Sequence, residues 1–366
     1  MDQTKKIKIC LVIPSLESGG MERVMSELAN QFAKNDGVDL HLVLYGSNRK
    51  IFYALPENIR IHKPNWKFDN SRRGTHAVRT LWFLRKKITS LQPDTVLSFG
   101  ELWNNIVLLS LLGTGIRVYV SDRSQPNKDL GWLQNTFRRW LYPRSAGVIL
   151  QTEKAKTIYN KHYKDLNIEV IGNPIRAIIN TDAGLVRQNQ ILMVGRLVAG
   201  KNQERLIKIF ARIDNKAWKL VLVGDGLPTQ NIKEKLIALT VKLDVADKVI
   251  FAGAQLNVEQ YYLTSKIFAF TSSSEGFPNV VGEAMSAGLP VISYDCLAGP
   301  SDMINDSING FLVPVFDDLM FENRLKKLMD NEERCKRFSS QAQADIKNFS
   351  VEAISTQFFS FIISNL

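Results

Sequence analysis

Short apolar segments alternate along the whole chain with stretches whose apolar residues recur at helical spacing. Ile7–Ile13 is a nearly continuous apolar run, and Met21–Lys34 follows it with helical spacing. Runs of this kind are typical of strands buried on both faces of a parallel sheet. Further strands are predicted in the first half at Val38–Leu44, Asp94–Phe99, Ile116–Ser121, Ala146–Leu150 and Glu169–Ile171, with helices at Thr75–Leu91, Trp103–Leu112 and Glu153–Tyr163. The pattern predicts an α/β fold.

The alternation stops at Gly172–Asn173–Pro174, and the polar stretch Asn180–Gln190 is interpreted as a linker. The alternation of strands and helices then restarts. Strands are predicted at Ile191–Gly195, Leu220–Gly224, Val249–Ala252, Ile267–Thr271, Val291–Tyr294 and Phe311–Pro314, and most of Phe316–Leu366 is predicted as helix. We expect two Rossmann-like doubly wound domains, residues 1–172 and 173–366, with the C-terminal helix as a candidate to cross back to the first. Ligands are expected at the carboxyl ends of the strands, in a central cleft that the two domains face.

Charge is distributed unevenly between the two halves. The chain has 366 residues and a formal net charge of +11. Residues 1–172 hold 26 Lys and Arg against 15 Asp and Glu, whereas residues 173–366 hold 21 of each. The asymmetry suggests an acidic partner for the first half, which could be nucleic acid, an anionic membrane or a polyanionic substrate.

Aromatic residues are interleaved with these cations. From Arg60 to Lys87 there are nine Lys or Arg and one acid, Asp69. The aromatics of this stretch are Trp66, Phe68, Trp82 and Phe83, and a second cluster combines Arg138, Arg139 and Arg144 with Trp132, Phe137, Trp140 and Tyr142. Such clusters suit an anionic membrane surface. The alternative is that the aromatics pack in the core and the cations are solvated.

Several classes of protein are disfavoured by what the sequence lacks. Three well-separated cysteines give no disulfide framework and favour a reducing, cytoplasmic compartment. The apolar runs are too short for a signal peptide or a membrane span. There is no D-x-D, no H-E-x-x-H and no Cys/His cluster, so neither a metal nor another cofactor is expected. The basic residues are dispersed and no nucleic-acid-binding motif is present, which argues against nucleic acid as a partner.

Two glycine-containing turns follow predicted strands. Gly19 and Gly20 lie between the first strand and the first helix, where the backbone can approach a ligand and a helix N-terminus attracts anions. Arg196 and Lys201 flank a loop after the first strand of the second half. A diphosphate would suit this pair, because Arg offers forked donors and Lys a point charge. The alternatives are an unliganded tight turn and two solvated surface cations.

Glu275 to Glu283 is the most informative stretch. It follows the predicted strand Ile267–Thr271, and a helix is expected to start at Pro278 or Asn279. Glu275 would then lie in the loop and Glu283 about one turn into the helix. Carboxylates suit sugar and ribose hydroxyls, and the free N–H groups of a helix start suit phosphate. The alternative is that either acid only stabilises the helix start.

Asp122 and Arg123 end another predicted strand, at the expected ligand edge of the first half. Their side chains could contact an acceptor or the transferred sugar. An internal pairing of Asp122 with Arg123 is an equally good interpretation.

Taken together, these motifs resemble the retaining GT-B glycosyltransferases of family 4, the "glycosyl transferases group 1" kind. The resemblance covers nearly the whole chain and includes the E-x7-E spacing of Glu275 and Glu283. It also includes Gly19–Gly20, Gly172–Asn173–Pro174, Gly195–Arg196–Leu197 with Lys201–Asn202, Val223–Gly224–Asp225–Gly226 and Ala287–Gly288–Leu289–Pro290–Val291. Ser121–Asp122–Arg123 stands where many relatives have a His that contacts the donor sugar, a variant similar to that of polysaccharide-assembly members.

The resemblance implies a role for each motif. Arg196 and Lys201 would neutralise the leaving diphosphate, Glu283 would bind the ribose, and Glu275 would contact hydroxyls of the donor sugar. The remaining donor contacts would come from Gly19, Gly20 and the backbone of Gly276, Phe277, Pro278, Asn279 and Val280. No protein nucleophile is required, because the leaving phosphate takes the acceptor's proton.

The resemblance therefore implies retaining transfer of a hexose or N-acetylhexosamine from a nucleotide sugar. UDP is the expected nucleotide because it is common among the donors of this family, and no residue of the sequence selects it. The acceptor would be a saccharide or lipid-linked saccharide in cell-surface polysaccharide synthesis. The expected location is cytoplasmic, peripheral on the inner face of the membrane. Alternatives are a GT-B-type UDP-sugar 2-epimerase and a basic nucleic-acid-binding protein.

Overall fold

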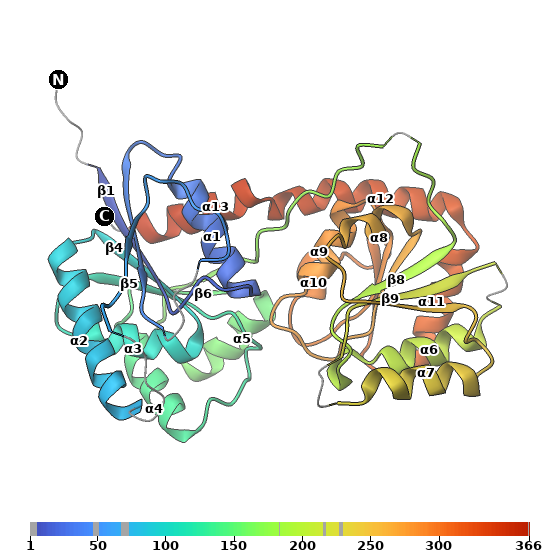
Figure 1. Ribbon diagram of the computed structural model, residues 1–366, viewed down its shortest axis with the longest axis horizontal. Helices are drawn as coiled ribbons and strands as arrows, with labels where there is room; N and C mark the ends of the chain where they lie inside the picture. The colour runs from blue at the N-terminus through green and yellow to red at the C-terminus, as the bar shows by residue number, and fades with distance from the viewer. Residues whose placement is uncertain are drawn as a thin grey trace. The chain divides into compact units, whose positions relative to one another are not determined.

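The chain divides into two compact units in the structure, which is a computed structural model (Figure 1). It describes residues 6–46, 51–66, 73–182, 184–214, 217–226, 230–364 and 366. Unit 1 comprises residues 1–174 and 351–366, and unit 2 comprises residues 175–350. The first boundary lies two residues after the predicted Gly172. The last helical segment, the candidate to cross back from the predicted second domain 173–366, belongs to unit 1 in the structure.

Unit 1 contains a parallel sheet of seven strands in the order β3-β2-β1-β4-β5-β6-β7. Their bounds are β1 Ile7–Ile13, β2 Val38–Leu44, β3 Arg60–His62, β4 Thr95–Phe99, β5 Arg117–Ser121, β6 Gly147–Leu150 and β7 Ile168–Val170. The order reverses at β1, which pairs with β2 on one side and with β4 on the other. The carboxyl ends of β1, β4 and β5 therefore lie side by side, at the switch point where doubly wound sheets bind ligands.

Helices cover both faces of this sheet. The helices are α1 Gly20–Phe32, α2 Arg73–Leu91, α3 Glu101–Leu111, α4 Trp132–Leu141, α5 Glu153–His162 and α13 Val351–Ile363. One face packs on α2, α3, α4 and α5 through a buried apolar cluster. On the other face α13 packs beside α1, where the rings of Phe32 and Phe359 lie 5.4 Å apart. Gly147 makes room for α13, because a Cβ there would lie 2.7 Å from the Phe361 ring.

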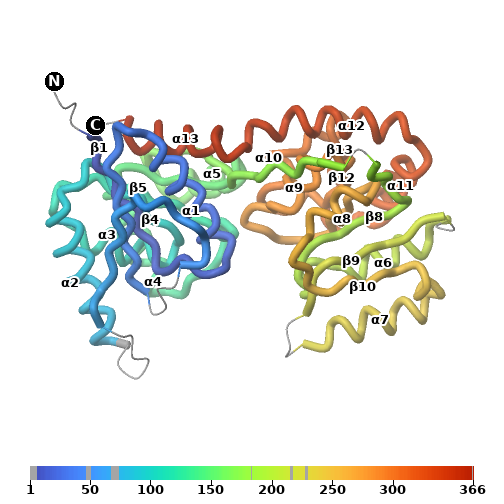
Figure 2. Tube along the Cα trace, turned by 45° about the horizontal axis from the view of Figure 1, so that its top comes forward, coloured from blue at the N-terminus to red at the C-terminus, as the bar shows by residue number. Residues whose placement is uncertain are grey.

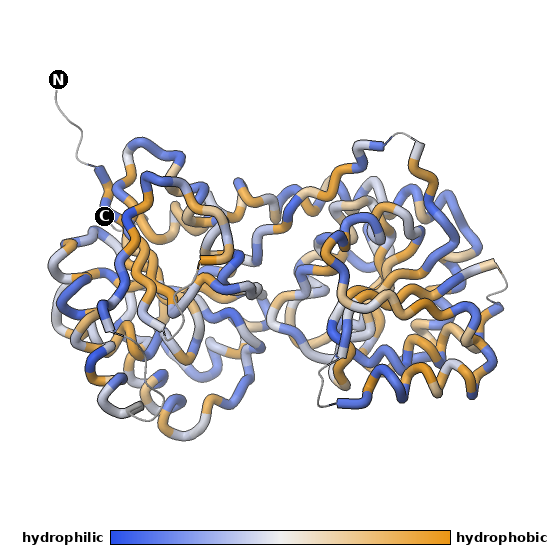
Figure 3. The backbone as a smooth tube through the Cα atoms, in the orientation of Figure 1, coloured by the Kyte–Doolittle hydropathy of each residue, from blue (hydrophilic) through white to orange (hydrophobic). Residues whose placement is uncertain are grey.

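Unit 2 contains a second parallel sheet, with the strand order β10-β9-β8-β11-β12-β13. Its strands are β8 Gln190–Val194, β9 Lys219–Val223, β10 Val249–Gly253, β11 Ile267–Phe270, β12 Val291–Tyr294 and β13 Gly310–Val313. The switch point is at β8, between β9 and β11. Figure 3 shows that most strands of the two sheets are largely hydrophobic, as expected for strands covered on both faces.

The helices of unit 2 are α6 Gln203–Arg212, α7 Ile232–Lys242, α8 Glu259–Thr264, α9 Asn279–Ser286, α10 Pro300–Met303, α11 Asp318–Met329 and α12 Glu332–Asp345. One core cluster joins α6, α7 and α11 to one face of the sheet, and α6 and α7 lie side by side (Figure 2). The other cluster joins α8 and α9 to the opposite face. Two doubly wound units of this kind confirm the predicted α/β class.

The segment predicted as a linker is packed on unit 2. Within Asn180–Gln190, the Arg187 guanidinium donates to the carbonyls of Tyr262 and Ser265 at 2.9 and 2.6 Å. The prediction from polar composition was wrong because these contacts involve backbone carbonyls, which composition does not reveal. Strand β3 and helix α4 were not predicted.

Candidate active site

The loop after β8 carries the two predicted cations of unit 2. It begins at Gly195, whose N–H donates to the Val223 carbonyl at 2.9 Å, and it runs close to the end of β9. Gly224 permits this approach: its φ is +131°, and a Cβ on it would lie 2.1 Å from the Gly195 carbonyl oxygen. The glycines at the ends of β8 and β9 therefore fix the path of the chain into Arg196.

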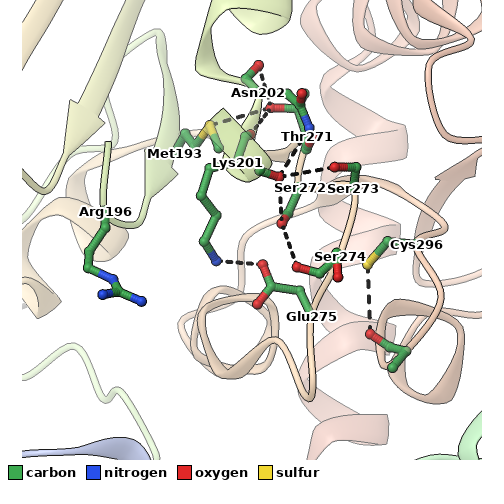
Figure 4. A network of polar contacts seen from close by, with 12 residues as sticks. Met193, Arg196, Lys201, Asn202, Thr271, Ser272, Ser273, Ser274, Glu275 and Cys296 are labelled. Atoms are coloured by element: carbon green, nitrogen blue, oxygen red, sulfur yellow. Dashed lines mark hydrogen bonds and ion pairs between the residues drawn. The ribbon is translucent and has the colours of Figure 1, made fainter. Parts of the chain in front are cut away.

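Lys201 and Glu275 form an ion pair at the carboxyl edge of the sheet (Figure 4). Lys201 Nζ lies 2.5 Å from Glu275 Oε1, and the two side chains are 20% and 14% exposed. The ammonium group also lies 5.3 Å from the centre of the Phe270 ring. The structure thus brings together two predicted residues that are 74 positions apart in sequence.

Arg196 is placed differently from Lys201. Its side chain is exposed and makes no hydrogen bond or ion pair with the residues that the structure describes. Figure 4 shows that it extends from the strand end in the same general direction as Lys201, separate from Glu275. Its five N–H donors are consequently available to an anion at this edge.

Hydrogen bonds hold the β8 loop against the loop that follows β11. Asn202, in the left-handed region with φ +54°, donates through Nδ2 to the Thr271 carbonyl at 3.0 Å. The Thr271 hydroxyl donates back to the Lys201 carbonyl at 3.0 Å. Ser273 N–H and the Ser272 hydroxyl donate to the Gly200 carbonyl at 3.0 and 3.2 Å. Because both loops are fixed to each other, the Lys201–Glu275 pair is preorganised.

Helix α9 begins where the sequence predicts, at Asn279 after the N-cap residue Pro278. Glu283 is its fifth residue, and its Oε2 accepts a hydrogen bond from the Tyr262 hydroxyl at 3.0 Å. Phe277 and Pro278 are buried, whereas Gly276, Asn279 and Val280 are partly exposed. Gly299 packs against Pro278 so closely that a Cβ would lie 2.0 Å from its Cδ, which fixes the entry to the helix.

In unit 1 the glycine turn is held by a residue distant in sequence. Gly19 is the N-cap residue of α1, and its N–H donates to the Tyr53 hydroxyl at 3.2 Å while its carbonyl accepts from the same hydroxyl at 2.9 Å. Gly20 is exposed, and a Cβ on it would meet no atom within 4 Å. No steric conflict with the described residues therefore requires a glycine at position 20.

Asp122 is enclosed by protein partners. It is 6% exposed, and its Oδ1 accepts from Asn104 Nδ2 at 2.9 Å and from the Tyr142 hydroxyl at 2.6 Å. Its Oδ2 accepts from the Tyr159 hydroxyl and lies 3.9 Å from Arg138 Nη2. Burial raises the pKa of this carboxyl, and Arg138 opposes the rise. The network accounts for Asp122 without a ligand, so its contact with a sugar stays a prediction.

Arg123 is partly buried, with its guanidinium near two aromatic rings of unit 1. Its guanidinium carbon lies 5.0 Å from the Phe99 ring centre and 5.8 Å from that of Phe358 on α13, and Nη2 donates to Asn173 Oδ1. Burial lowers its pKa to about 9, an effect that Glu101 and Asp122 oppose. The alternative interpretation was an internal pairing of Asp122 with Arg123. The structure shows no direct hydrogen bond or ion pair between these two described side chains. Instead, Arg123 links the end of β5 to α13 and to the glycine–asparagine–proline segment.

Several residues of the site escaped the sequence analysis. Tyr262 and Tyr53 hold Glu283 and Gly19, yet each is an ordinary tyrosine in its local sequence. Thr271 joins the two loops from the end of a strand. Only the resemblance could have drawn attention to these positions, because their partners lie far away in the sequence.

The described residues offer neither a cluster of metal-ligating side chains nor a membrane-spanning helix. No group of three or more His, Cys, Asp or Glu side chains there is arranged to hold a metal ion. No helix within the same residues combines the length and hydrophobicity needed to cross a bilayer.

Comparison with known proteins points to one family. Residues 179–345 match the family model described as "Glycosyl transferases group 1", and residues 18–177 match the one described as "Glycosyltransferase Family 4". Among curated relatives, an N-acetylgalactosamine-N,N'-diacetylbacillosaminyl-diphospho-undecaprenol 4-alpha-N-acetylgalactosaminyltransferase of Campylobacter jejuni is 29% identical, over 93% of this chain and 95% of the relative. The amylovoran biosynthesis glycosyltransferase AmsD of Erwinia amylovora is 27% identical, over 95% and 97%.

The fold is also that of solved glycosyltransferase structures. HepE of Anabaena in complex with UDP superposes with a TM-score of 0.81 at 18% identity, covering 98% of this chain and all of that one. The epimerase alternative is not favoured, because the relatives in this comparison are glycosyltransferases. With its two doubly wound units, its E-x7-E segment and these matches, the chain belongs to the family 4-like GT-B glycosyltransferases.

Proposed function

We propose that this glycosyltransferase uses a UDP-linked hexose or N-acetylhexosamine and retains the configuration of the transferred sugar. The observation that carries the proposal is the edge of unit 2, where Lys201 pairs with Glu275 and Arg196 is unpaired among the described residues. A diphosphate suits the two cations, and a sugar suits the carboxylate beside them. UDP is chosen because HepE, which has the same fold, was solved with UDP.

The proposed reaction needs no nucleophile from the protein. The bond between the anomeric carbon and the diphosphate oxygen breaks, and the acceptor hydroxyl oxygen forms the new bond on the same face. The leaving phosphate accepts the hydroxyl's proton. Arg196 and Lys201 would stabilise the charge that develops on the diphosphate, which is usually the largest contribution in such a reaction.

The other residues of unit 2 would hold the donor. Glu283, oriented by the Tyr262 hydroxyl at 3.0 Å, would accept hydrogen bonds from the ribose. Glu275 would contact the sugar hydroxyls once the diphosphate draws Lys201 toward it. Backbone N–H groups at the start of α9, next to Gly276, Phe277 and Pro278, would bind phosphate or sugar oxygens. In unit 1, the open backbone at Gly20 would lie against the diphosphate and the acceptor.

The acceptor we propose is a lipid-linked saccharide in polysaccharide assembly at the cytoplasmic face of a membrane. The name of the Campylobacter relative describes a saccharide carried on diphospho-undecaprenol, and AmsD is named for amylovoran biosynthesis. Nucleic acid and metal ions have no part in the proposal.

Docking on an anionic membrane would bring the enzyme to such an acceptor. The aromatics of the two basic clusters fall into two groups. Phe83, Trp66 and Phe137 pack in or against the core. By contrast, Trp82, Trp132 and Trp140 are 61%, 80% and 42% exposed. Phe68 and Arg72 lie outside the described residues.

The exposed aromatics are accompanied by cations. Lys86 Nζ lies 4.8 Å from the Trp82 ring centre, and the Arg144 guanidinium lies 4.7 Å from that of Trp140. Helix α4 also exposes 54% of Leu133, and neither α2 nor α4 contains an acid. Tryptophans beside cations suit the headgroup region, where each cation contributes on the order of 1 kcal/mol.

Liposome co-sedimentation tests this docking. Binding should require anionic lipid, weaken in high salt, and fall in a Trp132→Ser, Leu133→Ser, Trp140→Ser variant and in a Lys86→Ser, Arg139→Ser, Arg144→Ser variant. Arg85 is left unchanged, because it donates to the carbonyls of Ser110 and Leu112 and its loss would disturb α3. Equal binding to neutral and anionic liposomes would reject the docking.

A thermal-shift screen tests the choice of donor. A ligand that binds only the folded protein raises its melting temperature by mass action. UDP-sugars should raise it more than GDP- and ADP-sugars at equal concentration, and a Glu283→Gln variant should lose most of the difference. A larger shift with GDP- or ADP-sugars would refute UDP as the nucleotide.

A further inference from the structure

Glu101 occupies the ligand edge of unit 1, although no motif singled it out. It is the first residue of α3 and follows β4 after Gly100. Gly100, at φ +95°, donates its N–H to the Ser121 carbonyl at 2.9 Å. A Cβ on Gly100 would lie 3.0 Å from Met21 Sδ, at the start of α1. Glu101 therefore lies between the glycine turn after β1 and the end of β5.

The carboxylate of Glu101 is buried but poorly satisfied. The residue is 6% exposed. Its Oε2 accepts one long hydrogen bond, 3.3 Å, from Arg123 N–H, and its Oε1 lies 3.8 Å from Nζ of Lys128, which is beyond hydrogen-bond reach. A carboxylate can accept about four hydrogen bonds, so the described protein groups use only part of the acceptor capacity of Glu101.

Asp122, its neighbour on the same edge, shows the contrast. Each of the Asp122 oxygens accepts a tyrosine hydroxyl, and one of them accepts an asparagine amide as well. The same fold thus encloses one carboxylate with donors and leaves the other with spare acceptor capacity. The difference leaves acceptor positions of Glu101 available to a ligand.

The surroundings of Glu101 indicate the chemistry of that ligand. Trp103, two residues further along α3, is 38% exposed and packs edge-on against Tyr45 at 6.2 Å. Its ring lies back toward the start of the helix, because a Cβ on Gly100 would be 3.0 Å from Trp103 Cδ1. A carboxylate accepts hydroxyl groups, and an indole covers apolar C–H surface, so the two together suit a sugar ring. A phosphate would be repelled by the carboxylate.

We propose that Glu101 binds hydroxyl groups of the acceptor saccharide. This rests on the proposed function, which makes a saccharide the acceptor and assigns the two cations that bind the diphosphate to unit 2. Glu101 then fixes which hydroxyl of the acceptor is directed at the donor and acts as a specificity-determining residue.

The test compares Glu101→Gln with two matched variants. Glu153→Gln changes the first residue of α5, an exposed acid at the start of another helix of the same unit. Lys128→Gln removes the cation near Glu101. Only Glu101→Gln should lower kcat/KM for the acceptor, about ten- to a hundredfold, the range expected for a hydrogen bond to a charged group. The KM for the nucleotide sugar, its slow hydrolysis without acceptor and the melting temperature should stay at wild-type values.

Saturation-transfer NMR supplies a readout that does not need transfer activity. The probes are methyl α-glycosides of glucose, galactose, N-acetylglucosamine and N-acetylgalactosamine. At least one should bind the wild type and lose signal with Glu101→Gln, but not with Lys128→Gln.

Three results would overturn the inference: equal glycoside signals in wild type and Glu101→Gln, the same loss in Lys128→Gln, or a change confined to the donor's KM. Failure of the wild type to transfer sugar while the glycoside signals still differ would count against the proposed function alone.

Discussion

Arg196→Ala separates a catalytic role from a structural one, because the side chain has no protein partner among the described residues. Surface substitutions of this kind change the free energy of unfolding by less than about 0.5 kcal/mol. If Arg196 stabilises the leaving diphosphate, its loss removes one charged donor from the transition state. That loss costs on the order of 3 kcal/mol, a hundredfold or more in kcat.

Lys201→Ala gives the contrasting magnitude. It removes the 2.5 Å ion pair with Glu275 and the contact with the Phe270 ring, both largely buried. A hydrogen bond to a charged group contributes about 1.5–3 kcal/mol. We therefore expect Lys201→Ala to lower both the free energy of unfolding and the turnover, whereas Arg196→Ala lowers the turnover alone.

The assay is release of UDP from a UDP-sugar in the presence of acceptor, combined with urea unfolding of each variant. Lys219→Ala is the control, since it removes an exposed cation at the opposite, amino end of β9. Near-wild-type turnover in Arg196→Ala, or a loss matched by Lys219→Ala, would refute the assignment of Arg196 to the leaving group.

Three further predictions follow from particular residues. Transfer should survive excess EDTA, and complete loss that Mn²⁺ or Mg²⁺ restores would contradict the absence of a metal from the proposed reaction. Gly299→Ala should lower the free energy of unfolding by about 1–3 kcal/mol and weaken UDP binding, because φ is +107° and the new methyl group would meet Pro278. Gly74→Ala, where a Cβ meets nothing, should do neither, and calorimetry with UDP measures both. Burial lowers the pKa of His62 to about 4 and also lowers that of His41, its partner at 2.9 Å. Because the unfolded state binds protons more readily than the folded state, the contribution of these two histidines to the free energy of unfolding is complete above pH 6.5. It is lost as the pH falls toward 4. A His62→Gln variant should therefore lose less stability than wild type between pH 7 and pH 5 in urea titrations, and identical slopes would contradict the pairing.

The strands could be predicted within a residue or two, because strands buried on both faces are continuous apolar runs. Strand β3, Arg60–His62, escaped because it is a short edge strand with polar residues. Helix α4 was not predicted because its apolar residues do not mark its buried face. It exposes Trp132, Leu133 and Trp140, and it buries Arg138 against Asp122 and Tyr159.

The candidate site was predictable in position but not in contacts. Strand order places the carboxyl ends of β8 and β11 side by side, so Lys201 and Glu275 were expected at one edge. That they pair with each other, and that Tyr262 holds Glu283, depends on side-chain geometry between distant segments. The same limit applies to Asp122, whose four protein partners come from α3, α4, the turn after it and α5.

Transfer of a labelled sugar from a UDP-sugar to a lipid-linked saccharide tests the central claim most directly. The account predicts that UDP and one glycoside form in equal amounts, and that an α-linked donor gives an α-linked product. Consumption of the UDP-sugar to a C2 epimer without a glycoside, or a β-linked product, would contradict it.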